Sequence, residues 1–188
     1  MRTTLLLNLV ILALYSCSDH SSNLKISDVN NQSKKMTGKK FFEYDEITYY
    51  HCNCEESKIE GELFGNQKST ERDSLKIGII TGDIPKDISD LSFIEKLEQI
   101  GYTKHTVDKS NFADIDSIFI EKQDGERIAT ACMYIYRDIL IFKKQNRVIG
   151  TAKICFACMD NQIRGTTAQT DNFGQDEDYI RLKTILRK

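Results

Sequence analysis

The clearest pattern along the chain is a pair of apolar runs separated by a short polar link. Residues 136–142 and 148–156 are rich in Ile, Val, Phe and Tyr, which favour β-strands, and the KKQNR segment between them is polar. This pattern predicts a β-hairpin over residues 131–159, with Cys132 near its start and Cys158 near its end. We expect this hairpin to lie at the centre of an antiparallel sheet.

The length of the turn decides which residues face each other across the hairpin. A three-residue loop ending at a left-handed Asn146 places Cys132 opposite Cys158. A two-residue loop, Gln145 and Asn146, places Cys132 opposite Met159 instead and moves the side chains to other faces. Opposite residues on antiparallel strands lie within disulfide distance if both strands stay regular. The two-residue register also predicts that Asp138 faces Lys153.

Periodicity predicts the other elements of the domain. We expect strands over residues 41–54 and 75–80, and helices over residues 91–100, 110–122 and 176–188. Ser92 and Glu95 fit a capping box for the first of these helices, and Gly101 fits its C-terminal cap. The sequence therefore predicts a single α+β domain over residues 41–188, with two or three helices covering one face of the sheet.

The N-terminal segment has the pattern of a signal peptide. Arg2 precedes an apolar run from Leu5 to Leu14, and Cys17 follows. About 20 apolar residues are needed to span a bilayer, so this run is too short for a transmembrane helix. We expect residues 1–16 to be removed as a lipoprotein signal peptide.

The sequence Leu14-Tyr15-Ser16-Cys17 resembles the lipobox of bacterial lipoproteins. The resemblance implies that Cys17 is acylated and becomes the first residue of the mature chain. Because serine, rather than aspartate, follows that cysteine, it also implies an outer-membrane anchor on the periplasmic or the surface side. Residues 17–40 are polar and unperiodic, and we expect them to form a lipidated flexible tether.

The charge balance excludes one class of partner. Removal of residues 1–16 takes away one basic residue, Arg2, and leaves 25 basic and 28 acidic residues, a formal charge of −3. The strong basic excess typical of nucleic-acid-binding proteins is absent from this sequence.

Cysteine usage offers both structural and chemical interpretations. With Cys17 lipidated, five cysteines remain in a chain exported to an oxidising compartment. We predict a structural disulfide from Cys132 to Cys158, or to Cys155 if the end of the strand kinks. The alternatives are thiol-redox chemistry at the Cys155-x-x-Cys158 motif or a zinc or copper site. The ligands of such a site would be Cys132, Cys155 and Cys158 with one of Cys52, Cys54 or His51.

The sequence contains no GxSxG or HExxH motif, no glycine-rich phosphate loop and no EF-hand loop. We therefore expect no catalytic residues and no cofactor, with zinc as the alternative. The first functional hypothesis is a non-enzymatic, lipid-anchored envelope module that binds another protein or a cell-wall component. The second is a thiol-redox or metal-handling lipoprotein.

Three segments carry a family resemblance. They are CxxxYRDILIF at residues 132–142, KICFAC at residues 153–158, and FGQ followed by DYIRL within residues 173–182. Together they resemble an uncharacterised family of exported lipoproteins from Bacteroidota. The resemblance implies an envelope location and recurring cysteines at 132, 155 and 158, but it implies no activity.

Overall fold

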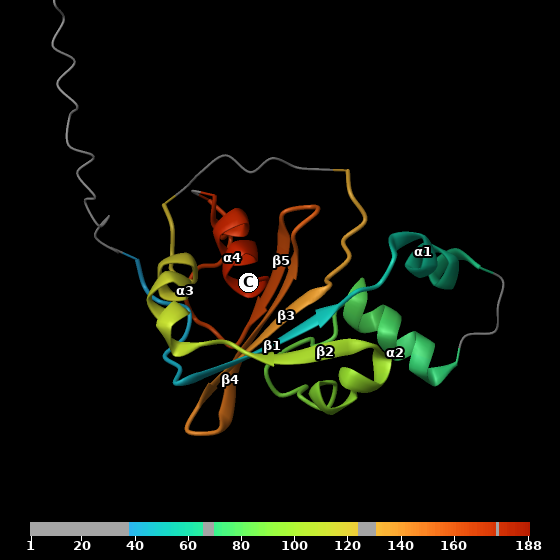
Figure 1. Ribbon diagram of the computed structural model, residues 1–188, viewed down its shortest axis with the longest axis horizontal. Coiled ribbons are helices and arrows are strands. Elements are labelled where there is room, and N and C mark those ends of the chain that lie inside the picture. The colour runs from blue at the N-terminus through green and yellow to red at the C-terminus, as the bar shows by residue number, and fades with distance from the viewer. Residues whose placement is uncertain (1–37, 66–69, 124–130, 176) are drawn as a thin grey trace, which may run out of the picture. The chain divides into compact units, whose positions relative to one another are not determined.

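The apolar runs build a five-stranded antiparallel sheet with the order β2-β1-β3-β4-β5 (Figure 1). The computed structural model describes residues 38–65, 70–123, 131–175 and 177–188. Cys17, the signal peptide and nearly all of the tether lie outside this part of the chain. The strands are β1 (Glu46–Cys52), β2 (Tyr102–Thr106), β3 (Asp138–Lys144), β4 (Arg147–Cys155) and β5 (Asp160–Arg164).

The helices are α1 (Glu56–Phe64), α2 (Glu71–Ile80), α3 (Phe112–Ile118) and α4 (Asp178–Leu186), with 3-10 turns η1 (Ile94–Lys96), η2 (Glu98–Ile100) and η3 (Lys109–Asn111). The predicted α+β class is confirmed, and so is the central place of the 131–159 hairpin, because β3 is the middle strand. The helices expected within residues 110–122 and 176–188 are present as α3 and α4.

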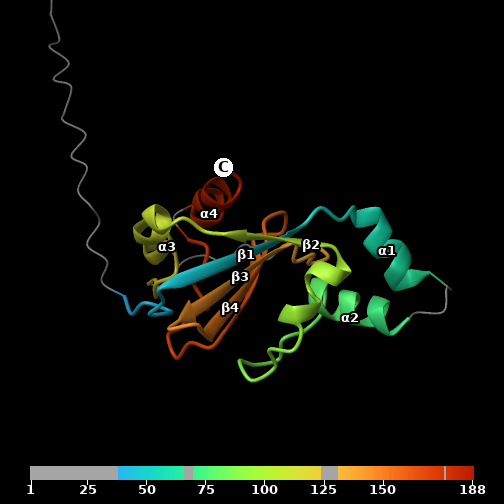
Figure 2. The same cartoon turned by 60° about the horizontal axis from the view of Figure 1, so that its bottom comes forward.

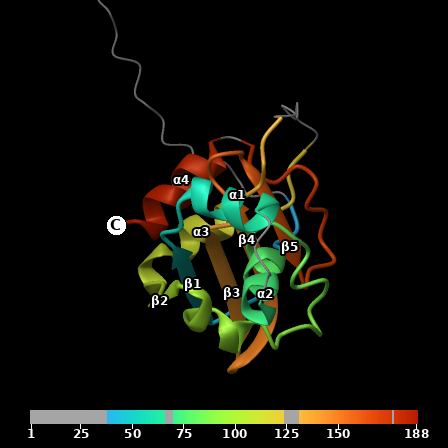
Figure 3. The same ribbon diagram turned by 90° about the vertical axis from the view of Figure 1, so that its right-hand side faces the viewer.

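Helices cover both faces of the sheet, whereas we predicted cover on one. One apolar cluster joins the sheet to α3 and α4, and a second joins it to α1, α2 and the turns η1 and η2. Figure 2 shows α3 and α4 on the opposite side of the sheet from α2, and Figure 3 shows α1 beside α2. The reason lies in β3, whose DILIF residues are all buried, because a strand covered on both faces needs no polar alternation.

The hairpin turn has two residues, and a β-bulge follows it. Gln145 and Asn146 both have left-handed backbones, with φ of 50° and 60°, as a tight hairpin turn requires. Lys143 pairs with Val148, but Phe142 pairs with Gly150, so the bulge adds one residue to β4.

The bulge makes the predicted Asp138–Lys153 pair wrong. Beyond it Asp138 lies opposite Ile154, and Lys153 lies opposite Ile139. A shift of one residue moves a strand's side chains to the other face of the sheet. Lys153 therefore points away from Asp138 and toward α2.

Two other predicted elements differ from the structure. The LKIGII run at residues 75–80 forms the second half of α2 and is not a strand. Thr70 and Asp73 cap this helix with reciprocal hydrogen bonds, which stabilises its first turn. The helix expected over residues 91–100 is instead the two short turns η1 and η2, although Gly101 does end them in a left-handed conformation.

Gly150 allows an aromatic ring to lie directly on the sheet. The Phe42 ring stacks on Phe142, the residue opposite Gly150, with ring centroids 4.4 Å apart. A Cβ atom at position 150 would overlap the Phe42 ring. We expect Gly150→Ala to lower the free energy of unfolding by about 1–3 kcal/mol through overpacking, as measured by urea denaturation.

A matched control for this substitution is Gly61→Ala. A Cβ atom at position 61 of α1 would meet no atom within 4 Å. Alanine is favoured over glycine inside a helix, so Gly61→Ala is expected to be neutral or stabilising by up to about 1 kcal/mol. Equal effects of the two substitutions would contradict the packing argument.

Candidate functional site

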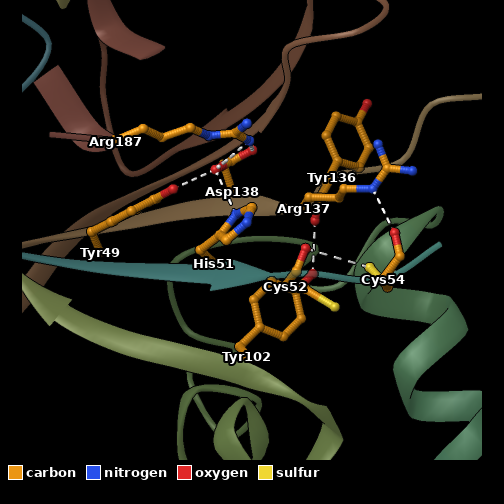
Figure 4. A network of polar contacts seen from close by, with 9 residues as sticks. All are labelled: Tyr49, His51, Cys52, Cys54, Tyr102, Tyr136, Arg137, Asp138 and Arg187. Atoms are coloured by element: carbon orange, nitrogen blue, oxygen red, sulfur yellow. Dashed lines mark hydrogen bonds and ion pairs between the residues drawn. The ribbon is translucent and has the colours of Figure 1, made fainter. Parts of the chain in front are cut away.

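A buried carboxylate on β3, Asp138, gathers polar side chains from β1 and from the C-terminus (Figure 4). Its side-chain oxygens accept hydrogen bonds from the Tyr49 hydroxyl at 2.5 Å and from Arg187 at 3.0 Å. The His51 Nδ1 atom lies 3.0 Å from Asp138 Oδ1. We call these four residues, Tyr49, His51, Asp138 and Arg187, the Asp138 cluster.

Strand geometry explains how the Asp138 cluster forms. Tyr49 and His51 are two residues apart on β1, so their side chains point to the same face. His51 lies directly opposite Asp138 in the β1–β3 pairing, and Arg187 follows the last residue of α4. The cluster therefore connects the middle of the sheet to the C-terminal helix.

The donors around Asp138 compensate for its burial. Asp138 is only 1 % exposed, and an unpaired carboxylate in such a place would be strongly unfavourable. Burial, followed by the hydrogen bond to Asp138, raises the pKa of Tyr49 well above its ordinary value. Tyr49 therefore stays protonated and acts as a hydrogen-bond donor.

A pair of thiols lies at the end of β1, next to the Asp138 cluster (Figure 4). Cys52 is the last residue of the strand and is 3 % exposed, while Cys54 is partly exposed. The Cys54 sulfur turns back toward the strand and lies 3.7 Å from the Cys52 carbonyl oxygen. Both cysteine side chains pack in the apolar cluster that joins the sheet to α1 and α2.

Arg137 holds both of these cysteines in place. Its carbonyl oxygen accepts a 2.8 Å hydrogen bond from the Cys52 N–H, and its Nε donates a 2.9 Å bond to the Cys54 carbonyl. A weaker ion pair of 3.8 Å links its guanidinium to Glu56, the first residue of α1. Arg137, the residue just before β3, therefore holds the backbone between Cys52 and Cys54 in place.

The surroundings of Cys52 and Cys54 shift the pKa values of the two thiols in opposite directions. The interaction with the neighbouring Cys52 thiol, together with the positive charge of Arg137, lowers the pKa of Cys54 to about 7. The same interaction, together with burial, raises the pKa of Cys52 far above its ordinary value. The partly exposed sulfur is thus the one that ionises near neutral pH, and the thiolate is the reactive form of cysteine.

The disulfide predicted between Cys132 and Cys158 lies in another part of the fold. Cys132 and Cys158 form a disulfide, with Cα atoms 5.9 Å apart, and Cys155 is a buried free thiol. The bond does not come from continuous pairing of the hairpin, because residues 131–137 and 156–159 lie outside the strands. It joins two irregular segments beyond β3 and β4.

The metal ligands proposed from the sequence do not form a single site in the described part of the chain. Two of the six sulfur and nitrogen ligands are bonded to each other, and His51 contacts Asp138. Within the described residues, no group of three or more His, Cys, Asp or Glu side chains is placed to hold a metal ion.

Lys153 is a buried cation on the face of the sheet opposite Asp138. Its Nζ donates hydrogen bonds to the carbonyls of Ile79, Gly82 and Ile84 at 2.7, 2.7 and 2.9 Å. It also lies 4.7 Å from the centre of the Tyr136 ring. Burial lowers the pKa of Lys153 to about 7. Its three acceptors lie at and just beyond the end of α2, so we interpret Lys153 as a cap for this helix.

Sequence reasoning missed the roles of Tyr49, Arg137 and Arg187. Arg137 and Asp138 were recognisable as two charged residues at the start of an apolar strand. Their partners were not recognisable, because Tyr49 and Asp138 are 89 residues apart in the chain and Arg187 is 49 residues beyond Asp138. The pairing of β1 with β3 brings Tyr49 to Asp138, and the position of α4 brings Arg187 there.

Comparisons of the chain with protein-family models, with curated proteins and with solved structures found no match. None of the helices in the described part of the chain is both long and apolar enough to cross a membrane.

Proposed function

We propose that this chain is an exported lipoprotein, anchored in the outer membrane through Cys17, whose α+β domain is a non-enzymatic binding module of the cell envelope. The apolar run before Cys17 and its lipobox-like sequence support this proposal. The resemblance of the C-terminal half to exported lipoproteins of Bacteroidota also supports it. The partner is another envelope protein or a cell-wall component.

The observation that carries the proposal is the Cys132–Cys158 disulfide. Disulfides persist in oxidising compartments such as the periplasm and are rare in the reducing cytosol. A domain that holds one, behind a segment with the pattern of an export signal, is suited to the cell envelope. The same bond removes two of the three sulfurs from the alternative thiol or metal cluster at Cys132, Cys155 and Cys158.

The anchor is tested by replacing Cys17. With Cys17→Ser, we expect the protein to lose labelling by an alkyne fatty acid and to leave the membrane fraction for the soluble envelope fraction. The expected change is nearly complete, because one position carries all of the lipid. In the wild type, density-gradient separation is expected to place the protein with the outer membrane.

Cys155→Ala is a suitable control for this experiment. It also removes one thiol, but its sulfur is buried in the folded domain and cannot accept a lipid there. If Cys17→Ser remained labelled and membrane-bound, the lipoprotein proposal would be wrong. Elemental analysis of the same preparations tests the metal alternative, because one equivalent of zinc or copper would contradict a purely structural role for the cysteines.

A further inference from the structure

The thiol pair at the end of β1 has an asymmetry that a structural role does not need. Cys54 is partly exposed and Cys52 is buried, yet both side chains pack in the same apolar cluster, and the Cys54 sulfur lies 3.7 Å from the Cys52 carbonyl oxygen. A partner molecule can therefore reach Cys54, while Cys52 next to it is shielded within the fold. One reactive thiol in front of one protected thiol is the arrangement required for two successive nucleophilic steps on sulfur.

We propose that Cys54 and Cys52 form a thiol–disulfide exchange pair that reduces a disulfide of a partner molecule. Cys54 is the attacking thiol and Cys52 is the resolving thiol. This activity goes beyond the anchored binding module and uses different cysteines from the Cys132, Cys155 and Cys158 group.

The first step joins Cys54 to the partner. The Cys54 thiolate attacks one sulfur of a disulfide R–S–S–R′, the S–S bond breaks, and R′S⁻ leaves with the electron pair and takes up a proton from water. Cys54 is then held in a mixed disulfide with R.

The second step releases the partner. Cys52 attacks the Cys54 sulfur, the mixed disulfide breaks, and the proton of Cys52 passes to the leaving RS⁻, which departs as RSH. The products are a Cys52–Cys54 disulfide and two reduced thiols. Two electrons pass from the pair to the partner, and no other oxidant or reductant is needed.

Arg137 positions this chemistry. Its carbonyl and its Nε hold the backbone of Cys52 and Cys54, and its charge favours the Cys54 thiolate. Three other charged or titratable groups act on the pair. Lys76 of α2 and Tyr102 of β2 interact with the thiols, and Glu56 of α1 acts indirectly by pairing with Arg137. A cation at the carbonyl of the attacking cysteine stabilises its ionised form without blocking the sulfur.

The test uses the reduced full-length protein in detergent, with glutathione disulfide as the probe and mapping of non-reduced peptides as the readout. In the wild type we expect an internal Cys52–Cys54 disulfide with little glutathione bound. In Cys52→Ala we expect a stable glutathione adduct on Cys54, because no thiol can displace it. In Cys54→Ala we expect neither product at this site.

Cys52→Ser and Cys155→Ala are the controls. Cys52→Ser keeps a side chain of similar size in the buried position, so it must also trap the adduct if each variant retains the wild-type circular dichroism spectrum. Cys155→Ala is expected to behave as the wild type. A lasting glutathione adduct on wild-type Cys54, or no reaction at Cys54, would overturn the exchange pair without affecting the test of lipidation at Cys17.

A pH profile separates a reactive thiol from a merely exposed one. We expect the alkylation rate of Cys54 to rise with a midpoint near pH 7, about 3-fold faster at neutral pH than an ordinary thiol after allowing for its weaker nucleophilicity. Arg137→Met is expected to move this midpoint to higher pH, whereas Arg147→Met, at the exposed first residue of β4, is not. An unchanged midpoint in Arg137→Met would contradict the positioning role.

Discussion

Replacing Asp138 with alanine is expected to lower the free energy of unfolding by about 3–5 kcal/mol, the range measured when one partner of a buried ion pair is removed. The substitution removes the shared acceptor of Tyr49, His51 and Arg187. Tyr49 is buried, and a buried donor without an acceptor is itself unfavourable. Urea denaturation of the variant and the wild type measures the difference.

A substitution at the surface provides the comparison for this prediction. Glu62→Ala removes the ion pair between Glu62 and Lys76, whose atoms approach to 2.6 Å on the exposed sides of α1 and α2. Surface ion pairs contribute about 0–1 kcal/mol, so this variant is expected to unfold almost as the wild type does. If Asp138→Ala cost no more than Glu62→Ala, the Asp138 cluster would not be the polar centre of the fold.

Asp138→Asn separates the effect of charge from that of shape. Asparagine keeps the side-chain volume and one acceptor oxygen, but it loses the negative charge that faces Arg187. We expect an intermediate loss of stability, smaller than that of alanine. Equal losses for the two variants would mean that charge, and not the acceptor atoms, determines the contribution of Asp138.

The elements predicted correctly are those with strong periodicity in the sequence. In α4, Tyr179 and Leu182 are buried and Ile185 packs against the same cluster, which is the spacing of one helix face. The hairpin was recognised from two long β-branched runs around a polar link. These signals depend on local spacing, so they can be recognised without any knowledge of tertiary contacts.

The elements that were missed or misassigned lack such a signal. β2 has one buried residue, Tyr102, followed by four exposed ones, so no alternation marks it as an edge strand. The LKIGII run is too short for periodicity to distinguish a strand from a helix. The Thr70 to Asp73 spacing, a helix start signal just before it, was the evidence that favoured a helix.

The candidate site was less predictable because it depends on pairing and not on spacing. The cysteines and the Arg137-Asp138 pair were visible in the sequence, but their partners were not. The β1–β3 register places Asp138 opposite His51, the position of α4 brings Arg187 to it, and a single extra residue in the β4 bulge turns Lys153 to α2. No local sequence pattern indicates that β4 contains an extra residue.

The second large effect is expected from loss of the Cys132–Cys158 disulfide. The bonded residues are 26 positions apart, and chain-entropy estimates for a loop of this length give about 3.5 kcal/mol. The loop encloses the β3–β4 hairpin, and residual hairpin structure in the unfolded chain would reduce that gain. We therefore expect the double variant Cys132→Ala, Cys158→Ala to lose about 2–3 kcal/mol, a large part of the roughly 5–15 kcal/mol typical of a domain.

Measurements with and without a reductant test whether this loss comes from the covalent bond. A phosphine reductant is expected to lower the melting temperature of the wild type toward that of the double variant, while the double variant itself does not change. Cys155→Ala, which removes a buried thiol beside Tyr136 and Cys158 but no bond, should remain sensitive to the reductant. If the wild type melted at the same temperature with and without reductant, the cross-link would contribute nothing, and the stability of this region would come from the packing of Tyr136, Cys155 and Cys158 alone.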